Sequence, residues 1–240
     1  MDYYRDSEDG QAQADLNRLM DGTFSNQEAG MPEGTVHSEL LRRPGKLYVL
    51  ASHFHPDHFN KEVLQWREQR PDIIYIFSKD ILRHRRAQKE DAVWLKKGEE
   101  YKDETLSVRA FGSTDVGVSF LLQTGGKKIF HAGDLNNWHW MDESTEAEWK
   151  GAEKNFLHEL DDLYAYTPEV DVAMFPVDPR LGKEYMRGAG QFVTKIKTHI
   201  FVPMHFTPEY AKANAFRDFA EAHGVRFVSL THRGQKIEIE

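Results

Sequence analysis

The stretch Ser52-His53-Phe54-His55-Pro56-Asp57-His58-Phe59 follows the apolar run Leu47-Tyr48-Val49-Leu50, which has the composition of a buried strand. Three histidines and one aspartate lie within six residues, at the point where the strand should end. Because a strand directs alternate side chains to the same face, we expect His53 and His55 to reach one metal ion together. Pro56 cannot continue the strand ladder, so the chain turns and Asp57 and His58 approach from another side. Neutral imidazoles and a carboxylate suit Zn²⁺, Fe²⁺ or Mn²⁺, so the stretch predicts a metal site.

An ordinary polar loop is the alternative, because twelve histidines among 240 residues make chance clusters easier. Chance does not readily produce a strand, an alternation of histidines and a sharp turn together. The metal site is therefore the favoured interpretation.

The composition limits the class of protein. A chain of 240 residues can bury a substantial core, and we expect one domain over residues 1–240. No apolar run approaches the ~20 residues that cross a membrane, and the first residues lack the apolar segment of a secretory signal. The chain has no cysteine, which excludes disulfides, thiolate catalysis and cysteine zinc sites. These features predict a cytoplasmic protein without membrane partners.

The net charge of −8 argues against a general nucleic-acid binder, because neutralising phosphates requires clustered Lys and Arg. The one dense basic run, Arg83-His84-Arg85-Arg86, follows an apolar stretch and is better explained as the solvated face of a helix. We therefore expect a small-molecule substrate as the partner.

Short apolar runs alternate with amphipathic segments from Leu47 onward, which predicts a layered α/β architecture. Residues 1–46 are irregular, apart from a short helix over Asp15–Met20. The expected strands are Leu47–Ala51, Ile73–Phe77, Leu106–Ala110, Val116–Gln123, Lys128–His131, Val172–Phe175, Ile200–Val202, Arg226–Ser229 and Lys236–Ile239. The expected helices are Lys61–Gln69, Asp80–Arg86, Thr145–Tyr166, Lys183–Ile196 and Pro208–Ala222, and Thr145 with Glu148 forms a capping box.

Further ligand candidates follow other expected strands. Ile129-Phe130-His131 leads into Gly133-Asp134, where glycine permits close backbone approach and suits Asp134 as a bridge between two cations. Phe201-Val202-Pro203-Met204 leads into His205, and Met174-Phe175-Pro176-Val177 leads into Asp178. Each of these strand ends is weak evidence by itself. Together with the first stretch they form a convergent set of histidines and aspartates.

This set, in this order, resembles the metallo-β-lactamase superfamily of metal-dependent hydrolases, and most of all its ascorbate-6-phosphate lactonase-like branch. The matching motifs are His53-x-His55-x-Asp57-His58, Gly133-Asp134 and Pro203-Met204-His205-Phe206. The resemblance implies an αββα sandwich of two mixed sheets flanked by helices. It also implies one cation on His53 and His55 and a second on Asp57, His58 and His205, with Asp134 and a water or hydroxide between them. We expect one or two Zn²⁺ per chain, with Mn²⁺ or Fe²⁺ as alternatives, and Asp57 as the group that accepts and donates the proton.

Two features depart from the family. Many members have a further histidine ligand of the first metal in a turn, where this chain has Gly112-Ser113-Thr114-Asp115. Asp115 could supply an oxygen ligand or only cap its own turn, and Ser113 lies nearest the usual position; alternatively the first site is empty. Members also usually open with strands that residues 1–46 lack. We hypothesise that the chain begins late, and that a partner chain could supply the missing sheet edge, as in a homo-oligomer.

Sequence clues to the substrate are fewer. Arg180 could anchor a phosphate or carboxylate, although it sits with Lys183 and Arg187 at the spacing of a solvated helix face. Trp138 and His139 follow Asp134 and could wall the pocket, with packing the simpler role for His139. The favoured function is a small-molecule hydrolase that attacks an ester, lactone or phosphoester with a metal-bound hydroxide. A nuclease or phosphodiesterase on the same fold, and a non-catalytic metal-binding protein, are the rival functions.

Overall fold

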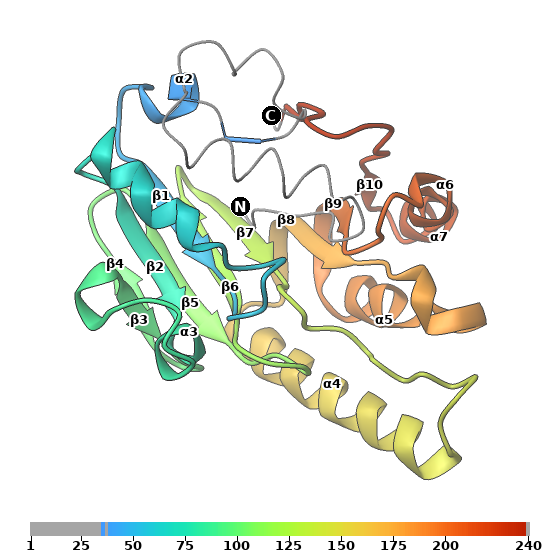
Figure 1. Cartoon of the computed structure of the whole chain (residues 1–240). Helices are drawn as coiled ribbons and strands as arrows, with labels where there is room; N and C mark the ends of the chain where they lie inside the picture. Colours follow the sequence, from blue (N-terminus) through green and yellow to red (C-terminus); the bar gives the residue numbers. More distant parts are fainter. Residues whose placement is uncertain (1–34, 37, 239–240) are drawn as a thin grey trace.

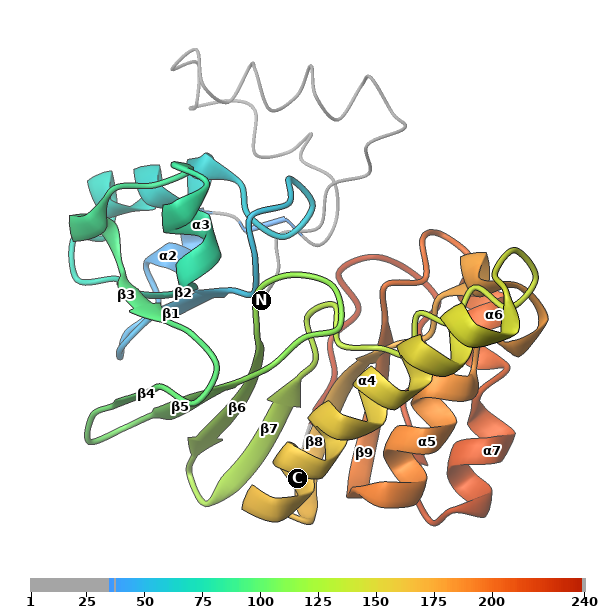
Figure 2. The same ribbon diagram turned by 90° about the horizontal axis from the view of Figure 1, so that it is seen from below.

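Two β-sheets face each other in the computed structural model, and helices cover the outer face of each sheet (Figures 1 and 2). The structure describes residues 35–36 and 38–238; the helix expected over Asp15–Met20 lies outside them, as does most of the irregular region. The smaller sheet has the order β1-β2-β3 and the larger sheet the order β10-β9-β8-β7-β6-β5-β4. This arrangement is the αββα sandwich that the family resemblance implies.

The smaller sheet is parallel throughout. Its strands are β1 (Tyr48–Ala51), β2 (Ile74–Ser78) and β3 (Val93–Leu95). Strand β2 is a continuous apolar run because both of its faces are covered, as is typical of parallel sheets. The elements between these strands are the 3₁₀ helix η3 (Lys61–Glu68), α3 (Lys79–Arg83) and the 3₁₀ helix η4 (Lys89–Asp91), and the short helix α2 (Ser38–Leu41) precedes the sheet.

The larger sheet is antiparallel from β4 to β7 and parallel from β7 to β10. Its strands are β4 (Glu100–Lys102), β5 (Ser107–Phe111), β6 (Ser119–Thr124), β7 (Lys127–His131), β8 (Glu169–Pro176), β9 (Lys197–Met204) and β10 (Arg226–Phe227). The helices are α4 (Glu146–Tyr166), the 3₁₀ helix η5 (Pro179–Glu184), α5 (Arg187–Lys195), α6 (Tyr210–Asn214) and α7 (Arg217–Ala222). Among the described residues no helix is long and apolar enough to cross a membrane.

Separate apolar clusters hold the layers together. Phe156 and Leu160 of α4 and Phe192 of α5 pack on the outer face of the larger sheet. Ile76 of β2 packs against Val108 of β5 between the two sheets. The capping box starts α4 as expected: Thr145 N–H donates to the Glu148 carboxylate at 2.8 Å, and Glu148 N–H donates to Thr145 Oγ1 at 3.4 Å.

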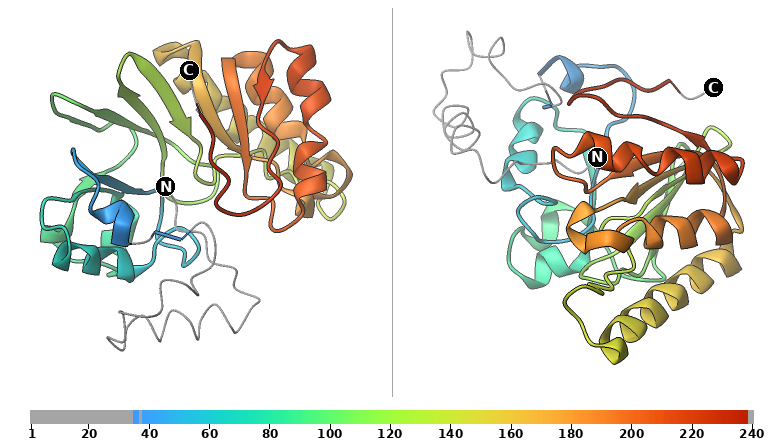
Figure 3. Two further views of the ribbon diagram at one scale, coloured as in Figure 1. Left: turned by 90° about the horizontal axis from the view of Figure 1, so that it is seen from above. Right: turned by 90° about the vertical axis from the view of Figure 1, so that its right-hand side faces the viewer.

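The segment after β10, residues 228–238, returns along the inner face of the larger sheet and has no regular secondary structure (Figure 3). Val228 packs there against Val172 and Ile200, and Leu230 and Ile237 join the same apolar cluster. The strand expected over Lys236–Ile239 is therefore not formed over residues 236–238, since side-chain packing rather than a backbone ladder holds this segment.

Several predicted boundaries differ from the structure for local reasons. The helix expected over Lys183–Ile196 begins later, as α5 at Arg187, and Lys183 and Glu184 belong instead to the 3₁₀ helix η5, which kinks at Gly182 with a φ of 81°. The helix expected over Pro208–Ala222 is likewise two short helices, α6 and α7. Strands β3 and β4 were not predicted, because three residues are too few to show an alternation.

Candidate metal centre

The predicted ligands meet at the edge where strands of both sheets end. Strands β7, β8 and β9 are parallel neighbours, and Asp134, Asp178 and His205 follow their carboxyl ends. The histidine-rich stretch follows β1 of the other sheet, and the Val118 N–H before β6 donates to Ser52 O at 3.0 Å, which joins the two sheets there. Ligand sites in α/β sheets commonly lie outside the carboxyl ends of strands.

The histidine-rich stretch forms a compact turn, not the end of a strand. Strand β1 ends at Ala51, and the N–H groups of His58 and Phe59 both donate to His55 O, at 3.0 and 2.8 Å. The explanation of His53 and His55 by strand alternation is therefore wrong, although the structure does bring the two side chains together. The ladder ends before Pro56, and the turn itself directs the histidines.

Ser52, which the sequence analysis did not single out, lies beneath this turn. Its fully buried hydroxyl lies 3.1 Å from His53 Nδ1 and 3.3 Å from His58 Nδ1. With both Nδ1 atoms engaged, the Nε2 atoms of the two histidines face Asp134. The hydroxyl thus fixes which ring nitrogen each histidine presents to the centre.

Two groups of metal-ligand atoms form around Asp134. One group comprises His53, His55 and Asp134, and the other Asp57, His58 and His205; within each group the ligand atoms lie within 4.8 Å of one another. Asp134 joins the groups, because its Oδ2 lies 3.3 Å from His53 Nε2 and its Oδ1 lies 3.1 Å from His58 Nε2 and 3.4 Å from His205 Nε2.

The chemistry of these atoms fits a bound cation. His53 Nε2 and Asp134 Oδ1 are buried and have no hydrogen-bond partner among the described residues, a costly arrangement for polar atoms. Burial opposes ionisation of Asp134, but the three surrounding histidines outweigh it and hold the pKa of this carboxyl far below its usual range. A carboxylate that stays ionised among imidazole nitrogens is a donor set suited to Zn²⁺, Fe²⁺ or Mn²⁺.

His205 is held by a buried carboxylate behind it. Its Nδ1 donates to Asp178 Oδ2 at 3.0 Å, and the Asp178 carboxylate also accepts from Arg180 Nε at 3.0 Å and Nη2 at 2.6 Å. Burial lowers the pKa of His205, but the neighbouring carboxylates of Asp134 and Asp178 raise it to about 9. Burial raises the pKa of Asp178, but His205 and Arg180 lower it to about 2. His205 itself has a φ of 60°, a left-handed conformation that is uncommon outside glycine and that clusters at functional sites.

Gly133 makes room for the centre. Its φ is 54°, and a Cβ there would lie 2.9 Å from both Ser52 Cβ and Val118 O. Any other residue would push the Asp134 turn away from Ser52, so this position requires glycine, as the sequence predicted. His131 Nδ1 accepts the Gly133 N–H at 3.1 Å and so braces the same turn.

A polar cleft of about 350 Å³, hereafter the metal cleft, opens onto the ligands. The predicted substrate residues Arg180 and Trp138 line it together with Asp115, and Trp138 Nε1 donates to Asp134 O at 2.8 Å. Trp140, two residues beyond Trp138, lines it as well, as does Thr114. Asp115 Oδ2 lies 3.9 Å from His55 Nδ1, and Asp115 N–H approaches Ser113 Oγ at 3.4 Å, so the geometry is compatible with a ligand and with a turn residue.

The structure does not bring His139 to the cleft. Its side chain is buried, with Nε2 3.1 Å from Glu184 O and Nδ1 accepting from Met141 N–H at 3.1 Å. These contacts give it the packing role that the sequence analysis weighed against substrate binding.

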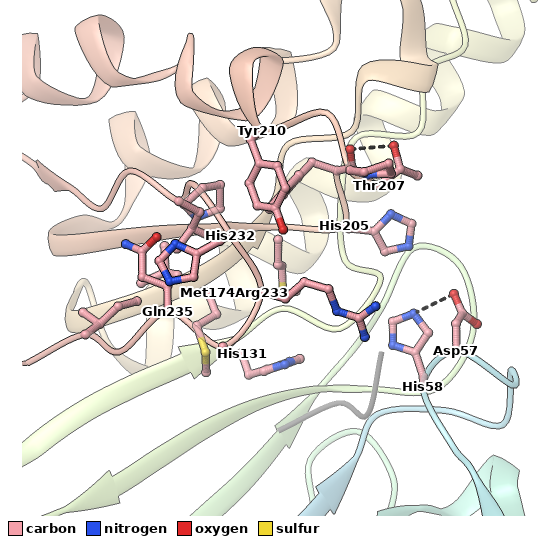
Figure 4. Close-up of a pocket in the computed structure, with 18 residues that line it drawn as sticks. Asp57, His58, His131, Met174, His205, Thr207, Tyr210, His232, Arg233 and Gln235 are labelled. Carbon is pink, nitrogen blue, oxygen red and sulfur yellow. Dashed lines mark hydrogen bonds and ion pairs between the residues drawn. The ribbon is translucent and has the colours of Figure 1, made fainter. Parts of the chain in front are cut away.

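A second, mostly apolar cavity of about 390 Å³, hereafter the apolar cavity, adjoins the centre from the other side (Figure 4). Asp57 and His205 line both hollows, and His58 and His131 also line the apolar cavity. Leu230, residues 232–235 and Ile237 of the segment after β10 form one of its walls.

An αββα sandwich with a candidate two-cation centre at the strand ends defines a class of metal-dependent proteins. The model of the beta-lactamase superfamily domain matches residues 35–206, and the chain belongs to this superfamily. Comparison with curated protein sequences finds no match.

Solved structures of low sequence identity share the fold. A protein from Parabacteroides distasonis described as a metal-dependent hydrolase is 17% identical, with a TM-score of 0.51 over 82% of this chain and 81% of its own. Igni18, a metallo hydrolase from Ignicoccus hospitalis, is 18% identical, with a TM-score of 0.52 over 78% of this chain and 77% of its own. CmlA, a diiron β-hydroxylase from Streptomyces venezuelae, is 15% identical, with a TM-score of 0.52 over 78% of this chain and 44% of its own. At these identities the likeness concerns the fold, and the specific resemblance to the ascorbate-6-phosphate lactonase-like branch stays a prediction.

Proposed function

We propose that the chain is a metal-dependent hydrolase of a small ester, lactone or phosphoester. The observation that carries the proposal is the pair of ligand groups joined through Asp134, with the buried His53 Nε2 and Asp134 Oδ1 lacking hydrogen-bond partners among the described residues. His53, His55 and Asp134 would hold one cation and Asp57, His58 and His205 the other. Divalent cations held there would supply a nucleophile from water near neutral pH and stabilise negative charge on the substrate.

The chain's own residues would position the substrate and move the proton. The Asp57 side chain is 43% exposed and lines both hollows, so its carboxylate can reach both solvent and a bound substrate and would carry the proton between them. Trp138 and Trp140, with ring centroids 6.3 Å apart, form an aromatic wall of the metal cleft. This wall would exclude water from one side of a bound substrate.

The test is hydrolysis of chromogenic substrates by protein loaded with Zn²⁺, Mn²⁺ or Fe²⁺. An aryl ester, an aryl phosphodiester and a lactone would be assayed before and after chelation, and after the cation is restored. We expect cleavage of at least one substrate, loss on chelation, and loss in Asp134→Asn but not in Asp218→Asn, an exposed carboxylate on α7. Hydrolysis that survives chelation and Asp134→Asn would contradict the proposal.

One observation favours a second candidate, a metal-binding protein without hydrolase activity. In the described part of the chain, the first ligand group consists of His53, His55 and Asp134 alone, and the nearby Asp115 side chain is 47% exposed. An incomplete first group would leave one cation on Asp57, His58 and His205. Failure of every substrate with every cation, in protein that does bind metal, would favour this candidate.

A further inference from the structure

The apolar cavity has a composition unlike that of the metal cleft. Its walls are mainly apolar side chains from β8, β9 and the segment after β10, among them Met174, Val202, Met204, Phe206, Leu230 and Ile237. Its volume of about 390 Å³ falls within the range of small-molecule sites. Because Asp57, His58 and His205 line one end, a molecule bound along this wall would place that end at the candidate metal centre.

Arg233 is the arginine that lines this cavity, and no carboxylate of the described residues pairs with it. It is half-buried, and it makes no hydrogen bond or ion pair with any residue that the structure describes. Figure 4 shows its guanidinium directed into the cavity, toward the side where His58 lies. Arg180, the cation of the metal cleft, differs because the Asp178 carboxylate already accepts from its Nε and Nη2.

The charge balance at this end of the cavity favours an anion. Among the residues that the structure describes, Asp57 is the one carboxylate that lines the cavity, and it belongs to a ligand group whose charge a bound cation would offset. Arg233 then adds a positive charge and a planar set of donors suited to a phosphate or carboxylate. The rest of the cavity lining is mainly apolar, with His131, His232, Gln235 and Tyr210 among its polar members.

We propose, resting on the proposed function, that the substrate is an amphiphilic anion. Arg233 binds its phosphate or carboxylate group beside the metal centre, and the apolar cavity binds its hydrocarbon part. The ester bond to be cleaved then lies at the end of the cavity lined by Asp57 and His205. A small, fully polar phosphoester would leave the apolar walls unused.

The test is calorimetric binding of octylphosphonate and octanoate, which have no ester bond to hydrolyse. Wild type, Arg233→Gln, Arg233→Lys and Lys236→Gln would be compared at equal metal content, and again after chelation. Lys236 is the matched control, an exposed cation of the same segment outside the cavity lining. Methylphosphonate lacks the octyl group, so its affinity shows how much the hydrocarbon contributes to binding. Octyltrimethylammonium carries the opposite charge, so its affinity shows how much the anion contributes.

We expect Arg233→Gln to weaken octylphosphonate binding by about 10- to 100-fold, both with and without metal. This is the contribution that a charge-assisted hydrogen bond makes to affinity. Lys236→Gln should bind as wild type does, and Arg233→Lys should retain part of the affinity. Methylphosphonate should bind far more weakly than octylphosphonate, because it leaves the apolar walls empty. The ratio of octanoate to octylphosphonate affinity assigns the anion as a carboxylate or a phosphate.

The inference is overturned if Arg233→Gln binds octylphosphonate as tightly as wild type does. It is also overturned if wild type binds methylphosphonate and octyltrimethylammonium with the same affinity as octylphosphonate. The proposed function can fail separately: binding through Arg233 without any hydrolysis would refute catalysis and leave the ligand class standing. Hydrolysis of short polar esters at the same rate in wild type and Arg233→Gln would support catalysis and refute the proposed ligand class. Thermal unfolding of each variant would exclude loss of the fold as the cause.

Discussion

Replacing Asp178 by Asn should weaken metal binding although Asp178 is not itself in either ligand group. Oδ2 of this buried carboxylate accepts from His205 Nδ1 and Arg180 Nη2, and Oδ1 accepts from the Arg180 N–H and Nε. Donors therefore face both oxygens. An amide would place its own N–H donors against one of these pairs in either orientation, and it would lose the charge that fixes the His205 ring.

The expected cost follows from one charge-assisted bond, about 1.5–3 kcal/mol, which corresponds to roughly 10- to 100-fold in metal affinity. Competition with a chromophoric chelator measures that affinity directly. Asp142→Asn is the matched control, because this exposed carboxylate accepts the Lys183 N–H of the same loop region but does not contact a ligand histidine. Equal affinities for Asp178→Asn and wild type would refute the view that Asp178 positions His205.

Three further predictions concern the turn, the core and the bound metal. Gly133→Ala should lower metal affinity at least tenfold, whereas Gly125→Ala, with a φ of 56° and nothing within 4 Å, should change stability but leave metal affinity intact; chelator competition separates the two. Leu160→Ala on the buried face of α4 should lower the free energy of unfolding by about 2–5 kcal/mol, against little change for the exposed Lys154→Ala; equal urea midpoints would contradict the packing. Chelation should lower the melting temperature, because metal at a hundredfold excess over its Kd stabilises the native state by about 2.7 kcal/mol; an unchanged melting curve would count against a resident cation.

Much of the fold could be predicted from local patterns. The apolar run of β2 and the capping box of α4 identify their elements because each signal lies within a few residues. Strands β3 and β4 are short and take their form from neighbours distant in sequence, β2 and β5. The path of residues 228–238 depends on tertiary contacts, so no local pattern could have predicted it.

The sequence predicted which residues gather at the candidate site, but not the side chains that orient the histidines. Strand ends in a parallel arrangement gather ligands at one edge, and this reasoning correctly placed Asp134 and His205 beside the first histidines. The roles of Ser52 and Asp178 depend on which ring nitrogen of a histidine they contact, which spacing does not encode. Ser52 lies immediately before the first histidine, and Asp178 lies between the end of a strand and Pro179. These positions were the only signals of the two residues that the sequence offered.

The most direct test of the two-cation centre is metal content per chain, measured by elemental analysis of protein loaded with Zn²⁺ and freed of excess. The two ligand groups joined by Asp134 predict about two equivalents in wild type. Asp134→Ala, which removes the carboxylate shared by both groups, should retain fewer than one. One equivalent in wild type, or a full complement in Asp134→Ala, would contradict a centre bridged by Asp134.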